Sequence, residues 1–149
     1  MGILPLIRII FGLTFIVSGA EKILSPYQNF LYVIQGYEVI PSPVDKWVAI
    51  GFPWIEFLLG ILLLAGLYTR ASMIAAMFVF ATFLIVVGQA LIRGIDLSEC
   101  GCFGELVSIP PNVVFLIDSV FFFLSGLCLI KWKETAKCGL DQIFQSKPE

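Results

Sequence analysis

The sequence predicts an all-α polytopic membrane protein, a four-helix bundle with a short interfacial helix in its first outward loop. Hydrophobic residues make up 59% of the 149 residues and charged residues 13%, whereas a soluble domain of this size carries about a quarter charged residues. A helix needs about 20 apolar residues to cross a bilayer. Four segments meet that length, at about 4–23, 47–67, 71–92 and 112–130, and form a single membrane domain over residues 1–149.

Two other interpretations of the apolar segments fit less well. A soluble helical bundle is disfavoured because 78–87 and 113–126 are apolar on every face rather than along one stripe. The first segment resembles a signal peptide at Ser18-Gly19-Ala20, but its basic residue, Arg8, lies inside the apolar run rather than before it. We therefore expect a first span, with Arg8 snorkelling to the cytoplasmic interface.

The distribution of basic residues predicts the orientation in the inner (plasma) membrane. Four spans place both termini on one side, together with Arg8, Arg70, Lys131, Lys133, Lys137 and Lys147. The other side has loops at about 24–46 and 93–111, which contain fewer basic residues and several acidic ones. By the positive-inside rule, both termini and the tail 131–149 lie in the cytoplasm and the two loops face the periplasm or its equivalent.

The first outward loop contains an amphipathic pattern. Apolar side chains recur there at helical spacing, at Tyr27, Phe30, Leu31, Ile34 and Tyr37. The stretch is too short to span a bilayer and ends before Pro41 and Pro43, since proline cannot continue a helix. It predicts a helix lying in the membrane interface over the mouth of the bundle.

Cys100 and Cys102 are the candidate catalytic residues. They lie with Gly101 between them in the second outward loop, where the surroundings permit disulfides. Glycine allows the tight backbone that a small disulfide ring needs. Such a ring adds little stability by loop closure, and a strained disulfide is easily reduced, which favours thiol–disulfide exchange. A structural staple, or two ligands of a soft metal shared with a partner, are the alternatives.

The other two cysteines predict no such chemistry. Cys128 lies in an apolar helix and is expected to be a small core residue. Cys138 lies on the cytoplasmic side and is expected to be a free thiol. No metal site is expected within the chain, because it has no histidine. No basic patch suggests nucleic acid as a partner.

Ionisable and polar side chains gather in the outward half of the spans. Such groups are costly in a membrane and mark function by default. A pocket for a quinone head group or for the cysteine loop of a partner is predicted there, lined by Glu21, Lys22, Glu56, Gln89, Arg93 and Asp118. A buried carboxylate in it would pass protons as the disulfide is reduced or remade. The alternative is structural, with a Lys22–Glu56 ion pair and an Asp118 hydrogen bond that fix helix register.

Several motifs resemble those of DoxX-like membrane proteins. They are GLTFIVSGAEK over 12–22, then Pro26, Phe30, Tyr37 and Pro41, then Pro53-Trp54-Ile55-Glu56 and GILLLAG over 60–66. Arg93-Gly94 followed by Cys100-Gly101-Cys102-Phe103-Gly104 resembles the MauE branch of that group, whose name refers to methylamine utilisation. The resemblance covers about 12–125 and implies a four-helix membrane protein linked to disulfide chemistry.

The resemblance also implies partners and an electron acceptor. A thioredoxin-like extracytoplasmic protein, or a disulfide-containing enzyme subunit such as that of an amine dehydrogenase, would exchange disulfides with Cys100 and Cys102. The DoxX branch makes quinone a candidate acceptor. DsbB and the vitamin K epoxide reductases are similar in shape, but their cysteines are spaced C-x-x-C. This chain has no second outward pair, so a partner would have to supply one.

The function predicted from the sequence is therefore that of a membrane thiol–disulfide oxidoreductase, or of its membrane subunit. Two alternatives belong to other classes. One is a non-enzymatic assembly factor or membrane anchor with a structural disulfide. The other is a small-solute transporter, which four spans disfavour because they leave little room for a pathway without oligomerisation.

Overall fold

The computed structural model describes residues 2–94, 110–137 and 139–141. These residues form six helices and no strand: α1 (Ile3–Leu24), α2 (Tyr27–Gly36), α3 (Val44–Ala65), α4 (Thr69–Arg93), α5 (Pro111–Ile130) and α6 (Trp132–Thr135). Four of them, α1, α3, α4 and α5, are long and apolar enough to cross a membrane. The predicted all-α fold with four spans is confirmed, and the chain is a multi-pass membrane protein.

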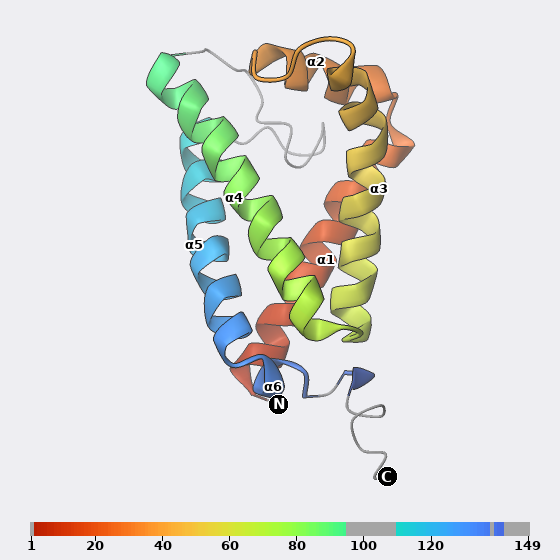
Figure 1. Cartoon of the computed structure of the whole chain (residues 1–149), viewed down its shortest axis with the longest axis vertical. Coiled ribbons are helices and arrows are strands. Elements are labelled where there is room, and N and C mark those ends of the chain that lie inside the picture. Colours follow the sequence, from red (N-terminus) through yellow and green to blue (C-terminus); the bar gives the residue numbers. More distant parts are fainter. Residues whose placement is uncertain (1, 95–109, 138, 142–149) are drawn as a thin grey trace.

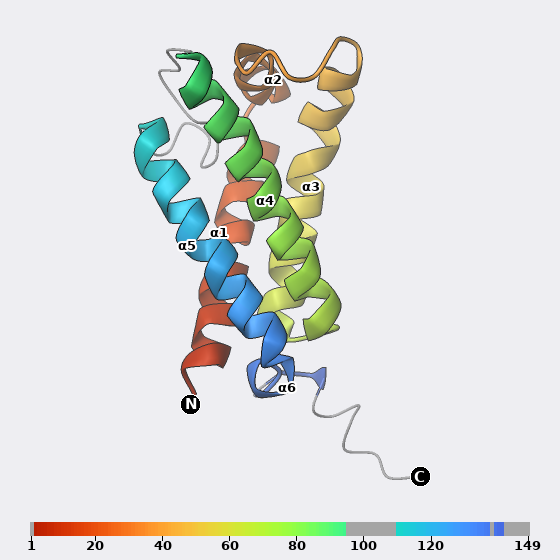
Figure 2. The same ribbon diagram turned by 60° about the vertical axis from the view of Figure 1, so that its left-hand side comes forward.

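The four long helices form two close pairs, α1 with α3 and α4 with α5. Helices α3 and α4 meet at their connecting turn and diverge toward the other end, which α2 covers (Figures 1 and 2). We call that end the α2 end. The opposite end, here the terminal end, holds the start of α1 and the short helix α6 (Figure 1).

Small residues let α1 and α3 approach closely. A Cβ added at Gly60 would lie 2.7 Å from the backbone nitrogen of Ile16 and 2.8 Å from the carbonyl oxygen of Gly12. A Cβ added at Gly19 would lie 2.7 Å from the backbone nitrogen of Phe57. Close packing through small residues is one of the interactions that drive helix association inside a membrane. It fixes the register of α1 against α3.

The ends of α3 differ from the expected span 47–67 for local reasons. The helix begins at Val44, directly after Pro43, so that Asp45 belongs to its first turn. It ends at Ala65 because Gly66 adopts a left-handed conformation with φ of 63°, as in a common helix C-cap. Glu56 therefore lies midway along the helix.

The short helix expected in the first outward loop is confirmed as α2. It turns Ile34 inward, and Tyr37 after its end is also buried. Gln35 Nε2 donates a 2.7 Å hydrogen bond to Oδ2 of Asp45, a carboxylate that is itself 2% exposed. This bond ties α2 to the first turn of α3.

Arg8 does not snorkel to the interface, so that expectation is wrong. Its side chain is 1% exposed, because Gly66 and Gly139 lie directly against its guanidinium. The chain after α6 returns to the α3–α4 turn, where the backbone nitrogen of Asp141 donates a 3.0 Å bond to the carbonyl oxygen of Gly66. That returning segment covers Arg8 at the terminal end.

The carboxylate of Asp141 caps the start of α4. It accepts hydrogen bonds from the backbone nitrogens of Tyr68 at 2.9 Å and Thr69 at 2.7 Å. Burial raises the pKa of Asp141, but these hydrogen bonds and the charge of Arg8 outweigh it, so the pKa lies below its ordinary value. Asp141 is therefore charged at neutral pH, and its carboxylate holds the returning segment against the start of α4.

Candidate functional site

A buried ion pair joins α1 to α3. Lys22 Nζ lies 2.8 Å from Oε2 of Glu56, and the two side chains are 1% and 2% exposed. Ser18, one turn before Lys22, accepts a 3.1 Å hydrogen bond from the ammonium. The hydroxyl of Ser18 donates to Glu56 Oε2 at 3.5 Å. The ion pair expected under the structural interpretation is therefore present.

Three aromatic rings surround the ammonium group of Lys22. Its Nζ lies 4.8 Å from the ring centroid of Phe30, 5.7 Å from that of Phe83 and 5.9 Å from that of Phe52. A cation is attracted to the face of an aromatic ring, more strongly where water is excluded. These rings come from α2, α3 and α4, so Lys22 ties four helices together.

Asp118 joins the same polar cluster from α5. It is 7% exposed and lines a cavity of about 30 Å³ together with Glu56 and Ser18. Thr14 contributes a second hydroxyl to the wall, and the remaining wall is apolar. A cavity of this size, with the carboxyl groups of Glu56 and Asp118 in its wall, has room for a single water molecule. We refer to Ser18, Lys22, Glu56 and Asp118 as the polar cluster.

The structure places the other predicted pocket residues elsewhere. Gln89 Nε2 lies 3.5 Å from the carbonyl oxygen of Tyr37, and Arg93 Nη2 lies 3.3 Å from Oε2 of Glu38. Glu21 accepts a 3.0 Å hydrogen bond from the hydroxyl of Ser25. Gln89 and Arg93 thus tie α4 to the turn after α2. Of the six residues predicted to line one pocket, Lys22, Glu56 and Asp118 lie in the polar cluster, whereas Gln89 and Arg93 contact this turn instead.

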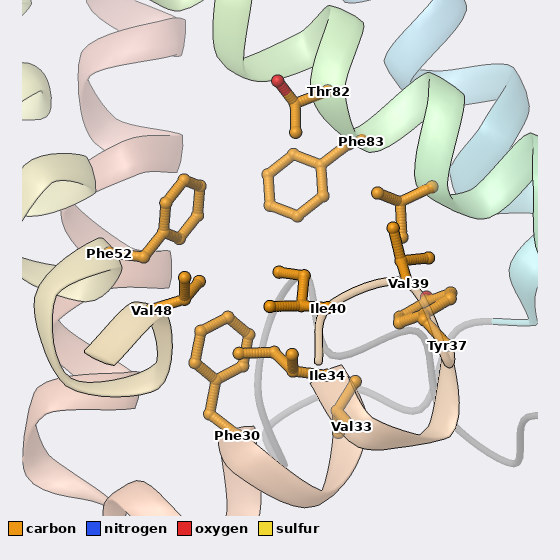
Figure 3. A pocket seen from close by; sticks show the side chains of 11 residues that line it. Phe30, Val33, Ile34, Tyr37, Val39, Ile40, Val48, Phe52, Thr82 and Phe83 are labelled. Carbon is orange, nitrogen blue, oxygen red and sulfur yellow. The ribbon is translucent and has the colours of Figure 1, made fainter. Parts of the chain in front are cut away.

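An apolar pocket of about 100 Å³ lies beneath α2, between α3 and α4. In Figure 3, Phe30, Phe52 and Phe83 approach it from three different helices, with Ile34 and Ile40 beside them. The same three rings lie within 6 Å of the ammonium group of Lys22. They therefore border both the apolar pocket and the polar cluster.

Two parts of this arrangement were not predicted from the sequence. Ser18 and Lys22 are four residues apart, which places them on one helix face. That spacing could have predicted Ser18 as a neighbour of Lys22. Phe52 and Phe83 gave no such signal, because aromatic residues are common in membrane spans.

Cys100, Cys102 and Cys138 lie outside the described residues. The segment containing Cys100 and Cys102 joins the end of α4 to the start of α5, and both of these helix ends are at the α2 end (Figure 1). Cys128 is 0% exposed in the core, as expected. Among the described residues, no group of three or more His, Cys, Asp or Glu side chains is placed to hold a metal ion.

Comparison with known proteins identifies the family. The family model described as "Methylamine utilisation protein MauE" matches residues 1–131. "Protein TlpB" of Flavobacterium psychrophilum is 34% identical over 139 residues, a match that covers 80% of this chain and 36% of the relative. The chain thus spans about a third of the length of that curated relative. No solved structure matches. The match over residues 1–131 shows that this chain is a member of the MauE family.

Proposed function

We propose that this chain is a membrane thiol–disulfide redox protein whose reactive pair is Cys100 and Cys102. The observation that carries the proposal is the Cys-Gly-Cys motif in the segment between α4 and α5. Both ends of that segment lie at the α2 end, toward which the ion pair and the apolar pocket also lie. The distribution of basic residues supports an inner-membrane protein with this end facing the periplasm and both termini in the cytoplasm.

The exchange needs a partner with its own cysteine pair. The thiolate of Cys100 or Cys102 attacks one sulfur of the partner's disulfide, forms a mixed disulfide and releases the other partner sulfur as a thiolate. The second cysteine then attacks the mixed disulfide, closes the Cys100–Cys102 bond and releases the partner as a dithiol. The reverse sequence oxidises the partner. A thioredoxin-like extracytoplasmic protein or a disulfide-rich enzyme subunit, such as that of an amine dehydrogenase, fits this role.

The polar cluster is suited to handling the protons of such an exchange. Two carboxyl groups, Glu56 and Asp118, share it with one ammonium group, Lys22. A single proton on either carboxyl makes the cluster neutral, and a water in the cavity would link the two. With quinone as electron acceptor, two electrons and two protons from the dithiol would reduce it to quinol. The apolar pocket beneath α2 offers an apolar ring or tail a place next to the cluster.

The state of the cysteine pair in cells tests the proposal. In a Cys128→Ser/Cys138→Ser background, acid quenching followed by a maleimide of known mass reports only on Cys100 and Cys102. Redox exchange predicts a mixture of thiol and disulfide that shifts with added reductant. It also predicts a mixed disulfide with the partner when Cys100→Ser or Cys102→Ser leaves a single thiol.

The alternative function, an assembly factor or anchor with a structural disulfide, predicts a different result. The pair would then stay fully oxidised in every growth condition, and the Cys100→Ser/Cys102→Ser double variant would support the partner's maturation as well as wild type. Either single variant would trap no partner. That combination of results would rule out redox exchange.

A further inference from the structure

The terminal end of the bundle has an open pocket of about 360 Å³ that the redox proposal does not use. It lies between the start of α1 and the end of α5. One side is apolar, formed by Ile3, Leu4 and Leu127, and the other side is charged, with Lys131, Glu134 and Lys137. The pocket is therefore amphipathic, like a lipid molecule.

The apolar side belongs to the face that the bilayer covers. Ile3 is 72% exposed and Leu127 is 55% exposed, and both lie on helices long and apolar enough to cross a membrane. Side chains of this kind, left outside the protein core, contact lipid tails in a membrane. An acyl chain can enter the pocket from the bilayer without crossing a polar surface.

The charged side lies just beyond the last residue of α5. Lys131 follows Ile130 directly, and Lys137 follows the short helix α6. With Glu134, the three side chains leave a net positive charge on a pocket open to the bilayer. Basic pockets at the ends of membrane-spanning helices bind the head groups of anionic lipids.

We propose that this pocket binds an anionic phospholipid. The phosphate lies between the ammonium groups of Lys131 and Lys137, and one acyl chain lies along Ile3 and Leu127. The site is at the opposite end of the bundle from the polar cluster and is independent of the function of Cys100 and Cys102.

Lipid titration of the full-length protein in dodecyl maltoside tests this inference, with bound lipid counted by native mass spectrometry. The probes are dioleoyl phosphatidylglycerol and dioleoyl phosphatidylcholine, which share acyl chains and differ in charge. Wild type should bind phosphatidylglycerol more tightly, and Lys131→Gln/Lys137→Gln should weaken that binding by about tenfold or more, since the variant loses two charge-assisted hydrogen bonds to the phosphate that a neutral amide replaces only in part.

A charge-matched variant separates the pocket from the general surface charge. Arg70→Gln/Lys133→Gln removes two positive charges from the same end, at exposed residues that do not line the pocket. It should leave phosphatidylglycerol binding within about threefold of wild type if the surface is screened at physiological salt. An equal loss in both double variants would overturn the proposal, as would equal binding of the two lipids. Displacement of the lipid by millimolar inorganic phosphate would identify a free-phosphate site instead and would also overturn it.

Discussion

The Lys22–Glu56 ion pair gives the sharpest prediction, because both side chains are almost completely buried and lie 2.8 Å apart. Removal of one partner of a buried pair leaves an uncompensated charge and costs about 3 to 5 kcal/mol. An unfolded chain in a micelle finds other partners, which lowers such costs. We therefore expect Glu56→Gln to reduce the free energy of unfolding by about 3 kcal/mol.

The two single variants should differ in what they leave behind. Glu56→Gln leaves the ammonium with Ser18 and three aromatic faces, which offset part of the loss. Lys22→Met removes those ring contacts as well and leaves the carboxyl with the hydroxyl of Ser18. The double variant Lys22→Met/Glu56→Gln should be closer to wild type than either single variant, about 1 kcal/mol less stable, because neither charge of the ion pair is left without the other.

Unfolding in mixed micelles of dodecyl maltoside and sodium dodecyl sulfate, followed by circular dichroism, measures these differences. Arg93→Gln is the control, since the Arg93–Glu38 pair is 47% and 68% exposed and should contribute at most about 1 kcal/mol. The reasoning would be refuted if each single variant cost less than about 1 kcal/mol and the double variant cost their sum. That result would mean that water reaches the pair in the folded protein.

Three further predictions concern the packing of the helices. Gly60→Ala should destabilise the bundle by about 1 to 3 kcal/mol, because its Cβ would meet backbone atoms of α1. Gly51→Ala is the matched control: nothing lies within 4 Å of its Cβ, so this variant should be no less stable than wild type in the same micelle assay. Asp141→Ala should cost about 1 kcal/mol at neutral pH through loss of the α4 cap. Because the folded-state pKa of Asp141 is lowered from 3.8, its contribution is present above that pH and fades as the pH falls through the folded value, so the two unfolding curves should converge in acid. Gln35→Ala should free α2 from the carboxylate of Asp45, and hydrogen exchange should then quicken in α2 while α1 stays unchanged; unaltered exchange in α2 would show that this bond does not hold the helix in place.

The spans were predictable because a bilayer requires a long apolar segment for each helix, whatever the helix packs against. The Lys22–Glu56 pair was also predicted, as the structural alternative, since the sequence places both charges in the same half of neighbouring spans. These features depend on local composition and on depth in the membrane. No knowledge of tertiary contacts is needed for them.

Arg8 shows where sequence reasoning fails. A basic residue near the end of a span ordinarily reaches water, and nothing near Arg8 in the sequence suggests otherwise. Its burial comes from Gly66 and from the segment around Gly139, residues far from it in the chain. Gln89 and Arg93 are a similar case. Gln89 was predicted near the end of its span and Arg93 directly after that span, and in the structure they lie against the carbonyl oxygen of Tyr37 and the carboxylate of Glu38.

The polar cluster itself requires an explanation beyond stability. A buried ion pair can often be replaced by apolar residues without loss of stability, so its presence is weak support for a purely structural role. The Lys22→Met/Glu56→Gln variant separates the two interpretations, because it should fold while lacking both charges. If the pair only fixes the register of α1 and α3, the cysteine pair of this variant should return to its disulfide form after reductant is removed as fast as in wild type.

If the cluster instead handles protons, the same variant should fold and reoxidise slowly. Asp118→Asn is the second arm, because it removes the other carboxyl from the cavity and leaves the Lys22–Glu56 pair in place. Slow reoxidation in both variants, with folding intact, would assign the protons of the exchange to this cluster. Normal reoxidation in both variants would mean that the carboxyl groups have a structural role only. The protons of the thiols would then pass directly to solvent at the α2 end.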